Sequence, residues 1–162
     1  MKSIKATIYK MRGRATATKF FMCTFLLIMS FAVQCQVETL TIICNTNGAP
    51  AAMKFTELKS VMKGEKQRWN SGAKVTIALM NTNTPIGKNT ARVIYNMSTN
   101  ELQKFNLSQH FQGISLTKFF NTISELENYV AQNPGAIGVV DQPLATNDVK
   151  IITIDGKTQF TL

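Results

Sequence analysis

Asn133-Pro134-Gly135-Ala136-Ile137-Gly138-Val139-Val140 is the stretch of this 162-residue chain that decides its fold class. Residues 124–130 just before it predict a short helix, and the Asn-Pro-Gly turn ends that helix because proline cannot continue it. Residues 136–140 are apolar and partly β-branched, which is typical of a buried strand. A helix that turns sharply into a buried strand indicates an α/β domain.

The remaining elements predict a mixed sheet with helices packed against it. The predicted strands are 39–45, 74–80, 136–140 and 150–154, and the predicted helices are 55–62, 86–97, 124–130 and one from a Ser98 or Thr99 cap to Phe111. The order β-α-β-α-α-α-β-β predicts one compact lobe. The residues expected to form its core are Leu40, Ile42, Phe55, Leu58, Val75, Ile77, Leu126, Ile137, Val139 and Ile152.

The first 35 residues predict a signal peptide, so we expect the mature protein to be periplasmic or secreted. Six Lys and Arg residues precede Phe20 without any acid, and residues 20–33 form a largely apolar run. As a helix, that run would be about 21 Å long, too short to cross a hydrocarbon core of ~30 Å. A single domain over residues 37–160 is expected to follow.

The processing of the N-terminal segment stays open. Cleavage after Ala32 and cleavage after Cys35 both fit the pattern of small or apolar residues at this point. A start at Met11 would give a more compact signal than a start at Met1. Gln34 stands where a lipoprotein signal needs a small residue, so lipidation is disfavoured, and so is an uncleaved membrane anchor.

The formal net charge of +9 sits largely in the signal segment. From Gln36 onward there are twelve Lys and Arg residues against nine Asp and Glu residues, and they are scattered along the chain. Without a basic stripe the domain cannot neutralise a row of phosphates, which excludes nucleic-acid binding. Contact with a membrane is expected only through the signal segment.

The side chains that carry catalysis are scarce. His110 is the only histidine, and its position near a helix end favours a structural role. Glu125 and Glu127 diverge because residues i and i+2 do not share a helix face, and no group of residues has the spacing of metal ligands. Cys44, the one cysteine of the mature domain, is expected to be a small core residue. The sequence therefore predicts no enzyme, no metal and no cofactor.

The polar loop after the second predicted strand is the candidate ligand site, because ligands of open α/β sheets bind beyond the carboxyl ends of strands. The candidate binding residues are Thr84, Gly87, Lys88 and Asn89. Lys88 would supply charge, and Gly87 would let the backbone approach a ligand. The alternative is an ordinary loop in which Thr84 caps the next helix. The loops at 45–47 and 141–142 could face the same crevice.

Four stretches of the mature chain together resemble one family. They are the helix, glycine, tryptophan and glycine segment at 55–72, the strand at 75–79, the helix from Phe105 towards Gly113, and the helix, Pro134-Gly135 turn and Ile137-Gly138 strand at 125–140. Their order is similar to that of the periplasmic phosphate-binding proteins that serve ATP-driven transporters, and in particular of their short, single-lobe relatives. The resemblance implies one lobe of the type 2 periplasmic-binding-protein fold, export, a phosphate or other small-anion ligand, and an envelope or transporter protein as partner.

The candidate loop departs from the pattern of that family. Where the family carries an arginine and a Ser-Gly-Thr run, this chain has Asn81 and Thr84-Pro85-Ile86, so only the Thr84 hydroxyl matches in kind. Trp69 is expected to be a packing anchor rather than a ligand contact. Two functions stay open: weak anion or small-ligand binding linked to phosphate transport, and a protein-interaction or accessory module of the cell envelope without a ligand.

Overall fold

The computed structural model describes residues 39–114, 116–142 and 148–161. All of them belong to the compact unit Val37–Leu162. The signal peptide predicted over residues 1–35 lies outside the described residues. Among those that are described, no helix is both long enough and apolar enough to span a bilayer.

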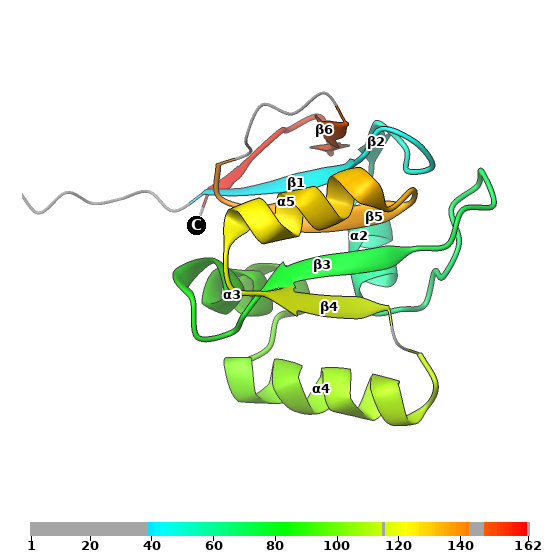
Figure 1. Ribbon diagram of the computed structural model, residues 1–162. Helices are drawn as coiled ribbons and strands as arrows, with labels where there is room; N and C mark the ends of the chain where they lie inside the picture. The colour runs from blue at the N-terminus through cyan, green and yellow to red at the C-terminus, as the bar shows by residue number, and fades with distance from the viewer. Residues whose placement is uncertain (1–38, 115, 143–147, 162) are drawn as a thin grey trace, which may run out of the picture. The chain divides into compact units, whose positions relative to one another are not determined.

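A mixed sheet forms the centre of the domain (Figure 1). Its strands are β1 (Thr39–Asn45), β3 (Thr76–Met80), β4 (Thr117–Phe120), β5 (Ala136–Val140), β6 (Val149–Ile151) and β8 (Phe160–Thr161). Their order is β4-β3-β5-β1-β6, and β8 pairs with the first part of β1. The short strands β2 (Ala52–Met53) and β7 (Thr153–Ile154) form a second, parallel pair.

The direction of the strands changes at β1. Strands β3, β4 and β5 run parallel to one another, whereas β1 runs antiparallel to β5, β6 and β8. The register places Ile42 opposite Val139 and Ile77 opposite Ile137. The predicted mixed α/β sheet is therefore confirmed.

Helices cover both faces of the sheet. They are α2 (Phe55–Met62), α3 (Pro85–Thr90), which continues as the π-helical turn η2 (Ala91–Tyr95), α4 (Thr99–Phe111) and α5 (Ile123–Gln132). Figure 1 shows α5 on one face and α2 and α3 on the other. The helix predicted over 86–97 ends earlier than expected, because Asn96 adopts the left-handed conformation with φ 55°.

Two helices begin with a reciprocal cap. Ser98 accepts a hydrogen bond from the backbone N–H of Glu101, and the Glu101 carboxylate accepts one from the N–H of Ser98. Thr122 and Glu125 make the same pair at the start of α5. Each capping box satisfies two backbone donors that a helix start leaves unpaired, so Ser98, rather than Thr99, caps the helix predicted up to Phe111.

The predicted core is confirmed except at Phe55. The other nine residues are at most 1% exposed, whereas Phe55 lies at the margin of the core with its ring centroid 5.6 Å from that of Phe160. Trp69 is 3% exposed and its indole N–H donates to the Gly135 carbonyl at 2.8 Å. Trp69 therefore packs the turn of residues 66–72 against the start of β5, as expected of an anchor.

The strands differ from the sequence-based expectation at four points. The strands β2, β4 and β8 were not predicted, and the strand predicted over 150–154 is divided into β6 and β7. Between these two strands, Ile152 donates its N–H to the Ile42 carbonyl at 2.9 Å. The chain then leaves β1 and pairs with β2. Residues 149–154 therefore contribute β6 to the central sheet and β7 to the second sheet.

Candidate functional site

The carboxyl ends of β3, β4 and β5 meet at one edge of the sheet because these strands are parallel. Asn81, Asn121 and Asp141 directly follow the three strands. The first turns of α3 and α5 begin at the same edge, each after a short loop. This is the edge where an open α/β sheet holds a ligand, and it contains the candidate loop.

Thr84 is fully used as the cap of α3. Its hydroxyl donates to the Asn81 carbonyl at 2.7 Å and accepts the Gly87 N–H at 3.1 Å. The N–H of Lys88 donates to the Thr84 carbonyl at 3.0 Å. The hydroxyl proton and two N–H groups that could face an anion are therefore bonded within the chain.

Gly87 packs against its own loop. A Cβ placed there would lie 2.1 Å from the Asn81 carbonyl oxygen and 2.9 Å from that of Met80. No side chain tolerates such contacts with backbone, so only glycine lets the helix start this close to the end of β3. The close approach that we predicted for a ligand is made by the chain itself.

Lys88 and Asn89 lie apart from the cap. Lys88 is exposed and lines a shallow hollow of about 410 Å³ together with Arg92 and residues 96–99. Asn89 is 9% exposed, and its side-chain oxygen accepts a hydrogen bond from the Arg92 guanidinium at 3.5 Å. The four candidate residues thus share one helix start, but Thr84 and Gly87 serve the cap while Lys88 faces the hollow.

Amide side chains occupy much of the remaining edge. Asn81 donates through its side chain to the side-chain oxygen of Asn121. Gln103 of α4 donates to the Thr82 hydroxyl at 2.6 Å. Sequence reasoning did not single out Asn121 or Gln103, because β4 was not predicted and α4 was not expected to reach this loop. Neutral amides therefore stand where a tight anion site would need positive charge.

The loop at 45–47 lies at the opposite edge, which corrects our expectation that it faces the same crevice. Since β1 is antiparallel to β5, its carboxyl end points away from the ends of β3, β4 and β5. Asn45 instead donates to the carbonyls of Val130 and Ala131 at 2.9 and 2.7 Å, near the end of α5. The loop at 141–142 does lie at the candidate edge, where Thr41 donates to the Asp141 carbonyl at 3.5 Å.

The titratable groups of the described residues do not form a reactive cluster. Burial raises the pKa of Cys44 to about 11, an effect that the Lys150 charge partly offsets. Burial also raises the pKa of Tyr95, whose hydroxyl lies 3.9 Å from the Met62 sulfur. His110 is exposed on the last turn of α4, and among the described residues no three His, Cys, Asp or Glu gather as metal ligands.

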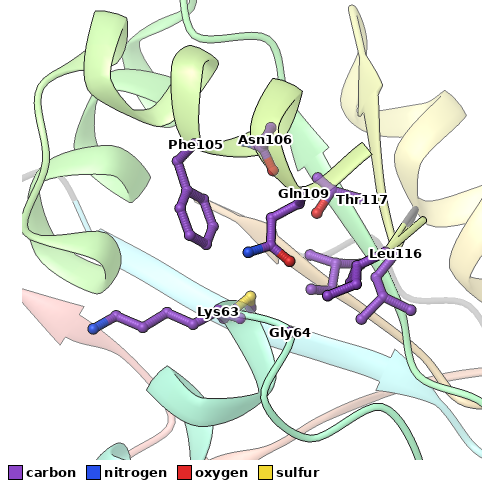
Figure 2. A pocket seen from close by; sticks show the side chains of 10 residues that line it. Lys63, Gly64, Phe105, Asn106, Gln109, Leu116 and Thr117 are labelled. Atoms are coloured by element: carbon purple, nitrogen blue, oxygen red, sulfur yellow. The ribbon is translucent and has the colours of Figure 1, made fainter. Parts of the chain in front are cut away.

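A small hollow separates α4 from the end of α2 and the segment before β4. Figure 2 shows the Gln109 side chain extending into it towards Gly64 and Leu116. The Gln109 side-chain oxygen is buried there and has no hydrogen-bond partner among the described residues. The hollow holds about 10 Å³, close to the minimum for one water molecule. It is too small for a phosphate ion.

The fold is found in solved structures of transport proteins. An ABC-type phosphate transport receptor from Vibrio cholerae superposes with a TM-score of 0.58 and 14% identity, over 75% of this chain and 48% of that chain. A phosphate ABC transporter substrate-binding protein from Clostridium perfringens, solved with bound phosphate, gives a TM-score of 0.55 and 15% identity over 72% and 45% of the two chains. PstS from Borrelia burgdorferi gives 0.56 and 15% over 74% and 49%.

These similarities define the class of fold. The described domain has the α/β fold found in phosphate transport substrate-binding proteins, and it spans about half the length of the three proteins named above. No family model matches the sequence, and no curated protein matches it. The resemblance seen in the sequence is thus confirmed at the level of the fold.

Proposed function

We propose that the protein is an exported, non-enzymatic single lobe that acts as a protein-interaction or accessory module of the cell envelope. The single-lobe part of the proposal is supported by the structural neighbours. The domain shares its fold with substrate-binding proteins and spans about half the length of those three proteins. Export is proposed from the basic segment and the short apolar run of residues 1–35.

The observation that carries the proposal is the state of the hydrogen-bond donors at the candidate edge. The Thr84 hydroxyl and the Gly87 N–H bond to groups of the same loop, and the Asn81 amide bonds to Asn121. An anion that entered here would have to break the cap and would leave polar groups without partners. Since an anion would have to replace hydrogen bonds that the chain already makes, strong phosphate capture is disfavoured at this edge.

A phosphate titration of the mature protein tests the proposal. We expect no saturable shift of backbone amide resonances at the start of α3 and no rise in melting temperature with phosphate or sulfate up to millimolar concentrations. Any ligand that binds the folded state must raise its stability. Micromolar phosphate binding would overturn the interaction-module reading.

A second candidate function is weak anion binding at Thr84, Gly87, Lys88 and Asn89, linked to phosphate transport. It is supported by the exposed Lys88 side chain beside Arg92, and by the three structural neighbours, whose titles name phosphate or PstS. A half-open site leaves one face of the ligand in water, so affinity would be millimolar and would fall with added salt.

Two lysine variants separate this candidate from general charge effects. Lys88→Ala should weaken such binding about tenfold, the loss of one charge-assisted hydrogen bond. Lys157→Ala, which removes an exposed lysine in a turn far along the chain, should leave it unchanged. If both variants weakened anion binding equally, the anion would be responding to the net charge of the protein and not to a defined site.

A further inference from the structure

Helix α4 has an unusual distribution of side chains. Its inner face carries Leu102, which is 1% exposed, and the partly buried Phe105 and Gln109. Its outer face carries Leu107 and Phe111, which are 56% and 81% exposed. The helix therefore carries large apolar side chains on both faces, whereas the outer face of an amphipathic surface helix is polar. The two exposed apolar side chains make the outer face a candidate docking surface.

The outer face also carries an open hollow. It measures about 320 Å³ and is lined by Asn100, Gln103, Lys104 and Leu107. These residues stand at positions i, i+3, i+4 and i+7 of one helix. In packed helix pairs, four residues of the facing helix form the hole that receives one side chain, the knob. The hollow has the residue spacing of such a hole.

The same helix supplies a matching knob. Phe111 follows Leu107 by one turn and Lys104 by two, so its ring lies on the same stripe as the hole. A surface that carries both a knob and its hole is self-complementary, and a two-fold axis can satisfy both at once. We propose that two copies of this chain associate through antiparallel α4 helices, with Phe111 of each in the hollow of the other. This inference rests on the proposed protein-interaction role and names its partner.

The geometry of α4 fixes the register of the pair. The centre of the hollow lies between Gln103 and Lys104, so the two-fold axis falls midway between that point and Phe111, at Leu107. Each Leu107 then packs against its symmetry mate, and each Lys104 ammonium lies beside the Phe111 ring of the other copy, a cation–π arrangement. The two Lys104 residues are about 10 Å apart along the axis, where salt screens their repulsion.

The size of the seam predicts a weak dimer. One helix face contributes less than the roughly 1,200–2,000 Å² that stable complexes bury. We therefore expect exchange between monomer and dimer in the micromolar to millimolar range. In such interfaces a few aromatic residues carry most of the affinity, and Phe111 fills that role here.

Sedimentation equilibrium of the mature protein tests the inference. The wild type should dimerise with rising concentration, and Phe111→Ala or Leu107→Asp should weaken dimerisation by about tenfold or more. Ile151→Ala is the matched control, since Ile151 is an exposed apolar residue of β6, 41% accessible, and should leave dimerisation unchanged. The altered side chains are exposed, so the melting temperature of the monomer should stay the same. A wild type that remains monomeric at millimolar concentration would overturn the inference.

A cysteine variant tests the register. Leu107→Cys should form a disulfide-linked dimer under mild oxidation, because the two side chains meet at the two-fold axis, whereas Ile151→Cys should not. Cys44 is buried and cannot compete. Equal cross-linking of both variants would overturn the register. If the protein is monomeric and binds no phosphate, a second copy is not the partner, but the proposed protein-interaction role still holds. Tight phosphate binding would overturn the protein-interaction role itself, whether the protein is a monomer or a dimer.

Discussion

Leu126 of α5 lies directly on Gly138 of β5: a Cβ added to Gly138 would come within 2.8 Å of the Leu126 Cδ2 atom. Val130 and Ile43 close the remaining space at 3.1 and 3.3 Å. The close packing of helix on sheet therefore leaves no room for a side chain at Gly138 unless Leu126 shifts. Gly138 has an ordinary backbone conformation, so its substitution tests space alone.

We expect Gly138→Ala to lower the free energy of unfolding by about 1–3 kcal/mol, the usual cost of overpacking a core. Urea denaturation measures this loss. The matched experiment repeats the substitution in a Leu126→Ala background, where the colliding atom is absent and the loss should be smaller. An equal loss in both backgrounds would show that Leu126 is not the source of the strain.

Ile77 of β3 tests the centre of the sheet. It is 1% exposed and lies between Thr117 of β4 and Ile137 of β5. Ile77→Ala should cost about 2–5 kcal/mol, because it removes buried methylene groups and leaves a cavity. A loss below about 1 kcal/mol in denaturant titration would contradict this burial, and Ile151→Ala on the surface should cost far less.

Two substitutions of Thr84 test whether its hydroxyl caps α3. Thr84→Ala removes the hydroxyl that bonds to Asn81 and Gly87, and should lower the free energy of unfolding by about 1 kcal/mol. Thr84→Ser keeps the hydroxyl and should retain most of the stability. If Thr84→Ala left the stability unchanged but weakened phosphate binding, the hydroxyl would serve a ligand and not the cap.

Cys44 predicts a fall in stability at alkaline pH. Burial raises its pKa from 9.0 to about 11, so the folded state keeps the thiol proton in a range where the unfolded chain loses it. The resulting stabilisation is present below pH 9 and lost between pH 9 and 11, at a slope of about 1.4 kcal/mol per pH unit. The difference in unfolding free energy between the wild type and Cys44→Ala isolates this contribution from that of Lys and Tyr. A difference that is constant from pH 8 to 11 would contradict it.

Export is tested on the intact chain. We expect the mature protein to begin between Val33 and Gln36 and to be found outside the cytoplasmic membrane, because the apolar run is too short to span it. Mass spectrometry of the exported fraction measures the N-terminus. An unprocessed chain retained in the membrane fraction would contradict this prediction.

The elements that could be predicted carry a strong local signal, either a continuous apolar run or a capping motif. Strand β5 is buried throughout and β1 is buried from Leu40 onward, and a capping residue marks the start of α4, so each was placed close to its observed bounds. Strand β4 was missed because it is an edge strand in which Lys118 and Phe119 are exposed, and its burial pattern does not alternate. A local pattern cannot show that such a segment pairs with β3.

The candidate site could be located but not understood from the sequence. The loop after β3 does lie at the ligand edge of the sheet, and Thr84 does begin a helix. Whether the Thr84 hydroxyl serves a ligand or the loop depends on its distance to the Asn81 carbonyl. The spacing of residues in the sequence does not give this distance. Asn45 was assigned to the wrong edge for a similar reason, since the antiparallel direction of β1 appears only in the pairing with β5.

The pairing of β1 determines when the domain can close. Its outer edge is covered by β6 at Ile43–Asn45 and by β8 at Thr39–Leu40, so the first strand to be synthesised receives its neighbours from the last residues of the chain (Figure 1). Contacts between residues so far apart in sequence form slowly. A chain leaving the ribosome therefore keeps this edge of β1 open until residues 149–161 have been synthesised. If the chain is exported as we propose, this delay keeps it in the extended state in which it can still be translocated.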